Sequence, residues 1–278
     1  MKTLKDKTAV VTGAGSGLGR SIALALAEAG TNVVVADIQS ETAEAVAREA
    51  CSRGVRALAV TCDVSDRASV ASLADKAYAE FGAVDILCNN AGISWRPYRS
   101  ILDTKLDDWK FILGINLWGV LHGLDAFVPR MRRQEGEKHI VNMGSLAGIF
   151  PHEAHAPYSA SKAAVVNLSE VIARELAPHN FGVTIVCPGA VKTNLGENTV
   201  RLRGEASAAD DRQFEPVDTP MMERMASFAL PSAEPVGVMV RNAILDNTMY
   251  LHTNSVPSDL VAERVHILFG PSTVGRTS

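Results

Sequence analysis

Short runs of β-branched residues alternate along the chain with longer, alanine-rich stretches of helical period. The runs are apolar almost throughout, as strands buried on both faces of a sheet require, and the alternation is typical of βαβ units. Strands are expected near 8–12, 32–37, 55–61, 84–89, 138–144, 182–187 and 248–254, and helices near 18–30, 40–53, 66–81, 106–134, 157–179 and 234–246. The sequence therefore predicts an α/β fold, a doubly wound parallel sheet that binds ligands at the carboxyl ends of its strands.

The chain has 278 residues, which fits one large α/β domain better than two compact ones. Hydrophobic residues make up 47% of it and charged residues 21%, the ordinary balance of a soluble globular protein. The net charge of −4 offers no attraction to phosphate backbones or anionic lipid headgroups. We therefore expect a single domain over residues 1–278 that has neither nucleic acid nor a membrane as a partner.

The N-terminus and the cysteines bear on cellular location. Residues 1–7 are polar and lack the regions of a secretory signal, and no uninterrupted apolar span of about 18 residues exists. The four cysteines are scattered without metal or redox spacing, as expected of small buried side chains in a reducing compartment. The sequence thus predicts a cytoplasmic protein with no metal site.

Two regions break the alternation. Residues 192–235 form a long, methionine-rich excursion after a strand, which is typical of a lid over a site, although the methionines can equally pack a surface helix. Its apolar cluster comprises Met221, Met222, Met225 and Phe228. In the C-terminal extension, about 255–278, residues 258–269 predict an extra helix and residues 270–278 a frayed tail.

A glycine-rich loop follows the first predicted strand and precedes an alanine-rich helix. Glycines let the backbone approach a diphosphate, and the helix N-terminus offers unpaired N–H groups and a favourable dipole. The spacing differs from the six-residue G-x-G-x-x-G pattern, because Leu18 takes the place of its last glycine when read from Gly13. The candidate phosphate-binding residues are Gly13, Gly15, Ser16, Gly17, Leu18 and Gly19.

An acid ends the second predicted strand. Asp37 lies 18 residues beyond Gly19, where a carboxylate accepts hydrogen bonds from both adenosine ribose hydroxyls and repels a 2′-phosphate. Ile38, rather than an arginine, follows it. NAD is therefore expected over NADP, the alternative for Asp37 being an ordinary strand-end or turn acid.

Tyr158 and Lys162 stand four apart on a predicted helix, so that their side chains share one face. A neighbouring ammonium is expected to lower the pKa of the phenol, which can then accept an alcohol proton. Ser145 ends a strand at the same edge of the sheet, where its hydroxyl can hold the substrate oxygen. Each feature alone has an ordinary explanation, a chance helical pair for the first two and a turn or cap for the serine.

In their order along residues 5–195, these motifs resemble the short-chain dehydrogenase/reductase family, of the ordinary, non-extended type. The resemblance rests on Thr12 to Gly19, Asn-Asn-Ala-Gly at 89–92, Asn116, Ser145 and Tyr158-Ser-Ala-Ser-Lys162. It implies a Rossmann fold, a dimer or tetramer, Tyr158 as general base or acid, Lys162 also on the nicotinamide ribose, Ser145 orienting the substrate, and Asn116 holding a relay water. It further implies cofactor contacts at Asp63, Val64, Asn90, Ala91, Gly92, Pro188, Gly189, Val191 and Thr193. From the residues alone, Asn116 could as well be a satisfied buried amide.

The segments beside the expected nicotinamide pocket bear on the substrate. His152 and His155 lack a third metal ligand and more readily line the pocket wall or meet solvent. Ser94, Trp95 and Tyr98 can line the same mouth, or pack the lid or a subunit contact. The ending of the chain resembles the subgroup that oxidises benzylic alcohols in aryl ethers.

The sequence therefore predicts an NAD-dependent oxidoreductase that interconverts a secondary alcohol and a ketone, the substrate being medium-sized and partly hydrophobic. Two alternatives stay open. One is a carbonyl reductase that uses NADPH, against which Asp37 argues. The other is a nicotinamide-sensing binding protein without turnover, which would not need Ser145, Tyr158 and Lys162.

Overall fold

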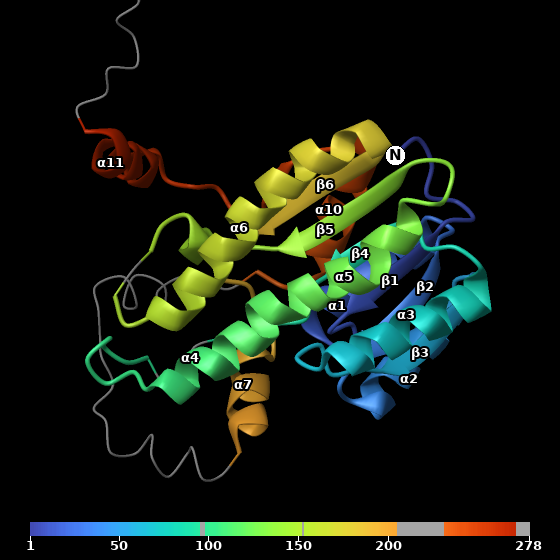
Figure 1. Cartoon of the computed structure of the whole chain (residues 1–278), viewed down its shortest axis with the longest axis horizontal. Coiled ribbons are helices and arrows are strands. Elements are labelled where there is room, and N and C mark those ends of the chain that lie inside the picture. The colour runs from blue at the N-terminus through green and yellow to red at the C-terminus, as the bar shows by residue number, and fades with distance from the viewer. Residues whose placement is uncertain (95–97, 152, 205–230, 271–278) are drawn as a thin grey trace, which may run out of the picture.

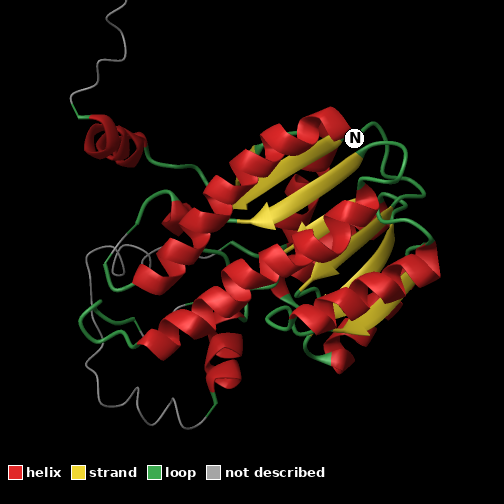
Figure 2. Cartoon of the chain, viewed as in Figure 1, coloured by secondary structure: helices red, strands yellow, loops and turns green. Residues whose placement is uncertain are grey.

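The computed structural model of the chain describes residues 1–94, 98–151, 153–204 and 231–270. Its centre is a seven-stranded, all-parallel sheet in the order β3-β2-β1-β4-β5-β6-β7 (Figures 1 and 2). The strands are β1 (Thr8–Thr12), β2 (Asn32–Asp37), β3 (Ala57–Thr61), β4 (Ile86–Asn89), β5 (Lys138–Met143), β6 (Phe181–Cys187) and β7 (Tyr250–His252). The predicted doubly wound sheet is confirmed, and its strand order reverses between β1 and β4.

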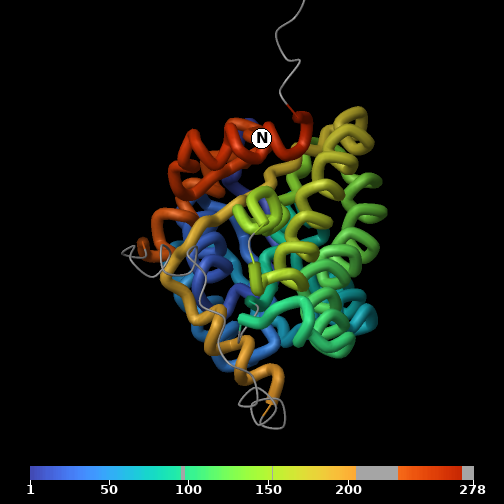
Figure 3. The backbone as a smooth tube through the Cα atoms, turned by 90° about the vertical axis from the view of Figure 1, so that its left-hand side faces the viewer, coloured from blue at the N-terminus to red at the C-terminus, as the bar shows by residue number. Residues whose placement is uncertain are grey.

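Helices cover both faces of the sheet, as Figure 3 shows in a view turned by a quarter. The helices α1 (Gly17–Glu28), α2 (Ser40–Cys51) and α10 (Glu234–Asp246) lie on one face, and α3 (Arg67–Phe81), α5 (Gly119–Met131) and α6 (Ala156–Leu176) lie on the other. The remaining helices are α4 (Leu106–Leu113), α7 (Leu195–Arg203) and α11 (Ser258–Phe269). The predicted helices therefore form, with ends that differ by a few residues, except that the stretch over 106–134 is divided into α4 and α5.

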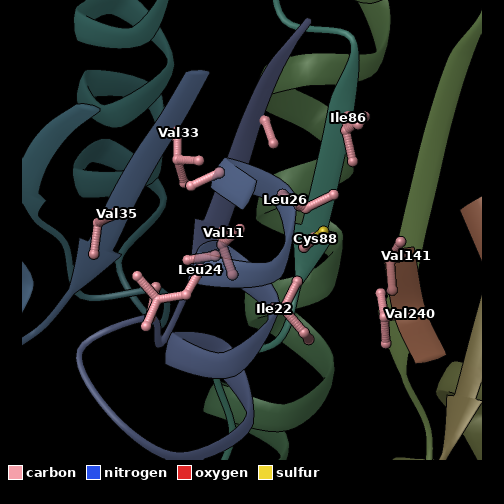
Figure 4. Close-up of a cluster of buried hydrophobic side chains, with 14 of the residues drawn as sticks. Val11, Ile22, Leu24, Leu26, Val33, Val35, Ile86, Cys88, Val141 and Val240 are labelled. Carbon is pink, nitrogen blue, oxygen red and sulfur yellow. The ribbon is translucent and has the colours of Figure 1, made fainter. Parts of the chain in front are cut away.

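Two apolar clusters fill the space between the sheet and its helices. Successive strand residues point to opposite faces, so Val11 packs against α1 while its neighbour Val10 packs toward α3. In Figure 4 the side chains of Val11, Val33 and Val35 gather with Ile22 of α1. Burial of both faces explains why the strands read as continuous apolar runs.

The cysteines are mostly buried, as expected. Cys62, Cys88 and Cys187 are buried, and burial raises the pKa of the Cys88 thiol to about 12 and that of Cys187 to about 11. These thiols therefore stay protonated and pack as small apolar groups. Cys51 departs from the expectation, because it ends α2 on the outer side and is exposed.

The predicted helix over 106–134 is interrupted. A π-helical turn, Gly114–Trp118, separates α4 from α5 and carries Asn116. Such turns are frequently found at functional sites. A window of 18 residues within Leu106–Met131 has a mean hydropathy of 1.5, so this helix is long and apolar enough to cross a membrane by length and composition. It packs against α3 and α6, which is equally typical of a core helix.

The two irregular regions are only partly described. The predicted lid contains α7, and its methionine cluster lies outside the described residues. The predicted helix over 258–269 is present as α11, which has no buried residue and stands away from the sheet in Figure 1.

The strand β5 departs from the apolar pattern, because it buries His139 completely. Thr184 donates a hydrogen bond to the Thr248 carbonyl (2.8 Å), so its oxygen accepts the Nε2 hydrogen of His139, also at 2.8 Å. The other ring nitrogen, Nδ1, has no hydrogen-bond partner among the described residues and lies against Gly182. Burial, with a smaller contribution from the N-terminal amino group, lowers the pKa of His139 to about 3.

Mild acid is expected to destabilise the fold through this histidine. As the pH falls below 6.5, the imidazole of the unfolded chain gains a proton, whereas the native imidazole stays neutral until about pH 3. The free energy of unfolding therefore decreases as the pH falls through this range. From pH 7.5 to 5 the free energy of unfolding should drop by about 2 kcal/mol. Urea unfolding at both values measures the loss, and His139→Gln should remove most of it. An equal loss in the variant would assign the effect to other groups.

Candidate active site

A cleft opens at the carboxyl ends of the strands, at the point where the strand order reverses. Residues from the ends of six strands, β1 to β6, and from α7 line it. The predicted site residues in the lining are Gly13, Ser16, Gly17, Leu18, Gly19, Asp37, Ile38, Asp63, Val64, Asn90, Ala91, Gly92, Ser145, Tyr158, Lys162, Pro188, Gly189, Val191 and Thr193. Gly15 and Asn116 are the predicted residues that lie outside it.

The glycine-rich loop presents the N-terminus of α1 to the cleft. Its cap residue, Ser16, makes no side-chain cap bond, and no acid lies in the first turn, so the first N–H groups remain available to a ligand. Gly17 has a φ of 53°, and a Cβ there would project into the cleft to within 3.5 Å of Thr193 on the opposite wall. A backbone cradle of this kind fits a dinucleotide diphosphate.

Two backbone N–H groups hold the carboxylate of Asp37 at one end of the cleft. Its Oδ2 accepts a hydrogen bond from the N–H of Gly15 (2.9 Å), and its Oδ1 accepts one from the N–H of Gln39 (3.0 Å). A Cβ on Gly15 would lie 2.9 Å from the Asp37 carboxyl carbon. Gly15 therefore contributes by seating the acid, which leaves each carboxylate oxygen free to accept a further bond from a ribose hydroxyl.

Asn90 ties the end of β4 to the glycine-rich loop. Its Nδ2 donates to the carbonyls of Thr12 (2.7 Å) and Gly13 (3.1 Å), while the Thr12 hydroxyl oxygen accepts from the N–H groups of Asn90 (3.0 Å) and Ala91 (3.1 Å). These bonds fix the two strand ends that border the switch point. The backbone of Ala91 and Gly92 consequently runs along the wall of the cleft.

Tyr158, Lys162 and Ser145 meet at the other end of the cleft. Lys162 Nζ lies 5.7 Å from the centroid of the Tyr158 ring and donates to the Met143 carbonyl at 2.8 Å. Ser145, at the end of β5, makes a hydrogen bond with the Tyr158 hydroxyl. The predicted sharing of one helix face by Tyr158 and Lys162 is confirmed.

The electrostatics differ from the sequence expectation. Burial raises the pKa of Tyr158, the hydrogen bond with Ser145 lowers it, and the nearby Tyr98 raises it. Burial also lowers the pKa of Lys162 to about 8. The prediction that Lys162 lowers the pKa of the phenol below its usual value is wrong for the chain itself, because desolvation by the surrounding protein outweighs the other effects.

Asn116 is a satisfied amide behind the cleft. Its Oδ1 accepts from the N–H of Ile93 (2.8 Å), and its Nδ2 donates to the Ile93 carbonyl (3.0 Å) and to the Ser161 hydroxyl (3.2 Å). A Cβ on Gly92 would lie 3.2 Å from Asn116 Oδ1 and 3.6 Å from Lys162 Nζ, so the amide and the ammonium flank the same backbone. Its role in holding a relay water stays a prediction.

Two aromatic rings pack next to Tyr158. The His155 ring stacks on the Tyr158 ring at 4.6 Å, and the Tyr98 ring meets His155 edge-on at 5.3 Å. Neither His155 nor Tyr98 lines the cleft, so both belong to its supporting wall. His152 and Trp95 lie outside the described residues.

The sequence did not single out the residues of α7 that face the cleft. They are Asn194, Leu195, Asn198, Arg201 and Leu202, and Gln39 joins them from the wall beside β2. Their signal in the sequence is a capping type of residue, Asn194, before leucines seven residues apart. The mixed charge of the segment is typical of a loop, so this helix was not predicted.

Comparison with known proteins agrees with this geometry. The family model described as short chain dehydrogenase matches residues 7–203. C alpha-dehydrogenase from Sphingobium sp. (strain NBRC 103272 / SYK-6) is 38% identical over 204 residues, which cover 73% of this chain and 66%, just under two thirds, of that protein. The CLA biosynthesis dehydrogenase/reductase of Lactiplantibacillus plantarum is 30% identical over 95% of this chain and 94% of its own length.

A solved structure extends the likeness to the whole fold. A short chain dehydrogenase/reductase from Burkholderia phymatum, in complex with NAD, superposes with a TM-score of 0.83 at 32% identity and covers 97% of this chain and 95% of its own. All described residues that line the cleft, including Ser145, Tyr158 and Lys162, lie within the residues that the family model matches. The chain belongs to the short-chain dehydrogenase/reductase family.

Proposed function

We propose that this oxidoreductase uses NAD to interconvert a secondary alcohol and a ketone. The observation that supports this most is the meeting of Ser145, Tyr158 and Lys162 at one end of a cleft whose other end holds Asp37. A proton-transfer group and a ribose-binding acid thus share one cavity. A binding protein without turnover would not need the first of them.

The chemistry divides between the cofactor and the side chains. NAD held by the glycine-rich loop and Asp37 would supply the hydride acceptor for the carbinol carbon. Ser145 holds the substrate oxygen by a hydrogen bond, and Tyr158 exchanges the hydroxyl proton with that oxygen. Because the pKa of Tyr158 is raised, its phenol keeps the proton at neutral pH and is ready to donate it to a ketone. Alcohol oxidation, which needs the phenolate, is favoured by alkaline pH.

The choice of NAD rests on charge. Asp37 is nearly buried, with 8% of its surface exposed, so its repulsion of a 2′-phosphate is weakly screened. The carboxylate is also fixed by two backbone N–H groups and cannot swing away without losing them. NADP is therefore the disfavoured cofactor in this proposal.

The cleft mouth favours a medium-sized, partly hydrophobic substrate. Leu202 and Ile93 belong to one apolar cluster with Tyr158 and provide apolar lining beside the catalytic end. The relative named C alpha-dehydrogenase and the resemblance of the chain's ending both favour an aryl secondary alcohol as the first class to test. A cytoplasmic location and a homo-oligomer, such as a homotetramer, complete the proposal.

A screen of aryl, steroid and aliphatic secondary alcohols with both cofactors tests the function. Formation of reduced nicotinamide, followed by absorbance, is expected with NAD, and kcat/KM should exceed that with NADP by about tenfold or more, the repulsion being on the order of 1 kcal/mol or larger. A preference for NADP would contradict the charge argument. Tight dinucleotide binding without turnover of any alcohol or ketone would indicate a sensor instead.

A further inference from the structure

The helix α7 lies over the cleft and closes its outer wall. In Figure 3 the orange segment leading into α7 runs across the end of the molecule that carries the carboxyl ends of the strands. Residues 194, 195, 198, 201 and 202 of this segment line the same cleft as Asp37 and Tyr158. The helix therefore faces whatever occupies the cleft.

Three contacts hold α7 in this position. The Thr199 hydroxyl is fully buried and accepts a hydrogen bond from the N–H of Ser94 at 2.9 Å. Leu202 packs on the buried apolar cluster of Ile93 and Ile112. At the end of the helix, Arg203 pairs with the buried carboxylate of Asp108. The orientation of the helix is thus set by packing on its inner side, which fixes where its other side chains point.

Arg201 extends from α7 to the adenosine end of the cleft. Its Nη1 donates to Gln39 Oε1 at 2.6 Å, and its Nη2 donates to Asn198 Oδ1 at 3.3 Å. The N–H of Gln39 in turn donates to Asp37 Oδ1 at 3.0 Å. One residue, Gln39, therefore connects the guanidinium of the outer wall with the acid of the inner wall.

Arg201 lies at a different end of the cleft from the other cation in its lining. Among the described residues that line it, the cations are Lys162 and Arg201. Lys162 is buried at the catalytic end, beside Tyr158. Arg201 is therefore the lining cation at the end where Asp37 and Ile38 define the ribose position, within the described part of the chain.

We propose that Arg201 is a specificity-determining, cofactor-binding residue that α7 supplies opposite Asp37. The inference rests on the proposed function, since it takes the cleft to bind a dinucleotide. A guanidinium binds phosphate oxygens strongly, whereas Asp37 repels them, so cofactor choice reflects two opposed charges on facing walls. With Asp37 present, Arg201 stays on Gln39 and closes α7 over the ribose. Without the acid's charge, the same guanidinium is in place for a 2′-phosphate.

The two charges should behave as a coupled pair in binding measurements. Asp37→Asn keeps the shape and one acceptor oxygen, and we expect it to tighten NADPH binding by about tenfold or more. Adding Arg201→Ala to Asp37→Asn should weaken NADPH binding by roughly tenfold, a charge-assisted bond at an exposed side chain being worth about that much. In the unsubstituted protein Arg201→Ala should weaken NADH binding by about two- to fivefold, because NADH lacks the 2′-phosphate and loses only the contact with Gln39 that holds α7 over the ribose.

The experiment is equilibrium titration of NADH and NADPH, followed by nicotinamide fluorescence, for the four proteins of this cycle. Arg241→Ala is the matched control, since it removes an exposed cation of α10 outside the cleft lining. An equal loss of NADPH affinity from Arg241→Ala, or no loss from Arg201→Ala in the Asp37→Asn background, would overturn the proposal. If the unsubstituted protein binds NADPH more tightly than NADH, the proposed NAD preference is wrong. In that case the role of Arg201 stands only if Arg201→Ala alone, with Asp37 in place, weakens NADPH binding.

Discussion

Replacement of Tyr158 by phenylalanine is expected to lower kcat for both alcohol oxidation and ketone reduction by roughly 10²- to 10⁴-fold, the contribution of a positioned general acid or base. The variant removes one oxygen and keeps the ring that stacks on His155 at 4.6 Å. The wall of the cleft should therefore keep its shape. Turnover measured with a substrate from the alcohol screen gives the loss, and titration with NADH should show nearly unchanged affinity.

Tyr98→Phe is the matched control for this prediction. It removes the same oxygen from a neighbouring ring, which meets His155 edge-on but does not line the cleft. We expect kcat to change by no more than a few-fold, since the hydroxyl of Tyr98 acts on Tyr158 only through a minor electrostatic effect. Retained turnover in Tyr158→Phe, or an equal loss in both variants, would remove Tyr158 from its role in proton transfer.

Much of the cleft could be predicted because of a simple property of parallel sheets. Motifs placed directly after strands, such as the glycine-rich loop after β1 and Asp37 at the end of β2, converge at one edge when the strands run in the same direction. Tyr158 and Lys162 follow the same logic within a helix, where a spacing of four sets a common face. Local patterns therefore sufficed for the glycine-rich loop, Asp37 and the catalytic cluster, whereas the lining residues that follow β3, β4 and β6 were expected only from the family resemblance.

The features that escaped prediction depend on packing between distant segments. The π-helical turn that interrupts 106–134 leaves no periodic signal, and it carries Asn116, which bonds to Ile93. The position of Arg201 depends on contacts that α7 makes with Ser94 and Asp108, far away in the sequence. The raised pKa of Tyr158 is likewise a property of the surrounding burial, which spacing along a helix does not reveal.

Packing between segments also holds Ser145 beside Tyr158. Ser145 begins a 3₁₀ turn, Leu146–Gly148, in which its hydroxyl oxygen accepts from the Ala147 N–H (3.1 Å) and its carbonyl from the Gly148 N–H (3.0 Å). The turn packs backbone against backbone on α6. A Cβ on Gly148 would lie 2.7 Å from the Lys162 carbonyl carbon and 2.8 Å from the Ala163 nitrogen. The absence of a side chain at Gly148 thus sets the distance between the serine and the catalytic helix.

Gly148→Ala is therefore expected to lower kcat by about 10²-fold, the usual cost of displacing a reacting group by about 1 Å. The added methyl meets backbone that cannot rotate away, so the turn must shift relative to α6 and carry Ser145 with it. The free energy of unfolding should also fall, by about 1–3 kcal/mol.

Gly114→Ala is the matched control, because a Cβ there meets nothing within 4 Å and the backbone is helical. It should leave stability within about 1 kcal/mol of the unsubstituted protein and kcat nearly unchanged. Steady-state kinetics and urea unfolding of both variants check this, and a Gly148→Ala protein that loses stability but keeps its kcat would show that the contact supports the fold without positioning Ser145.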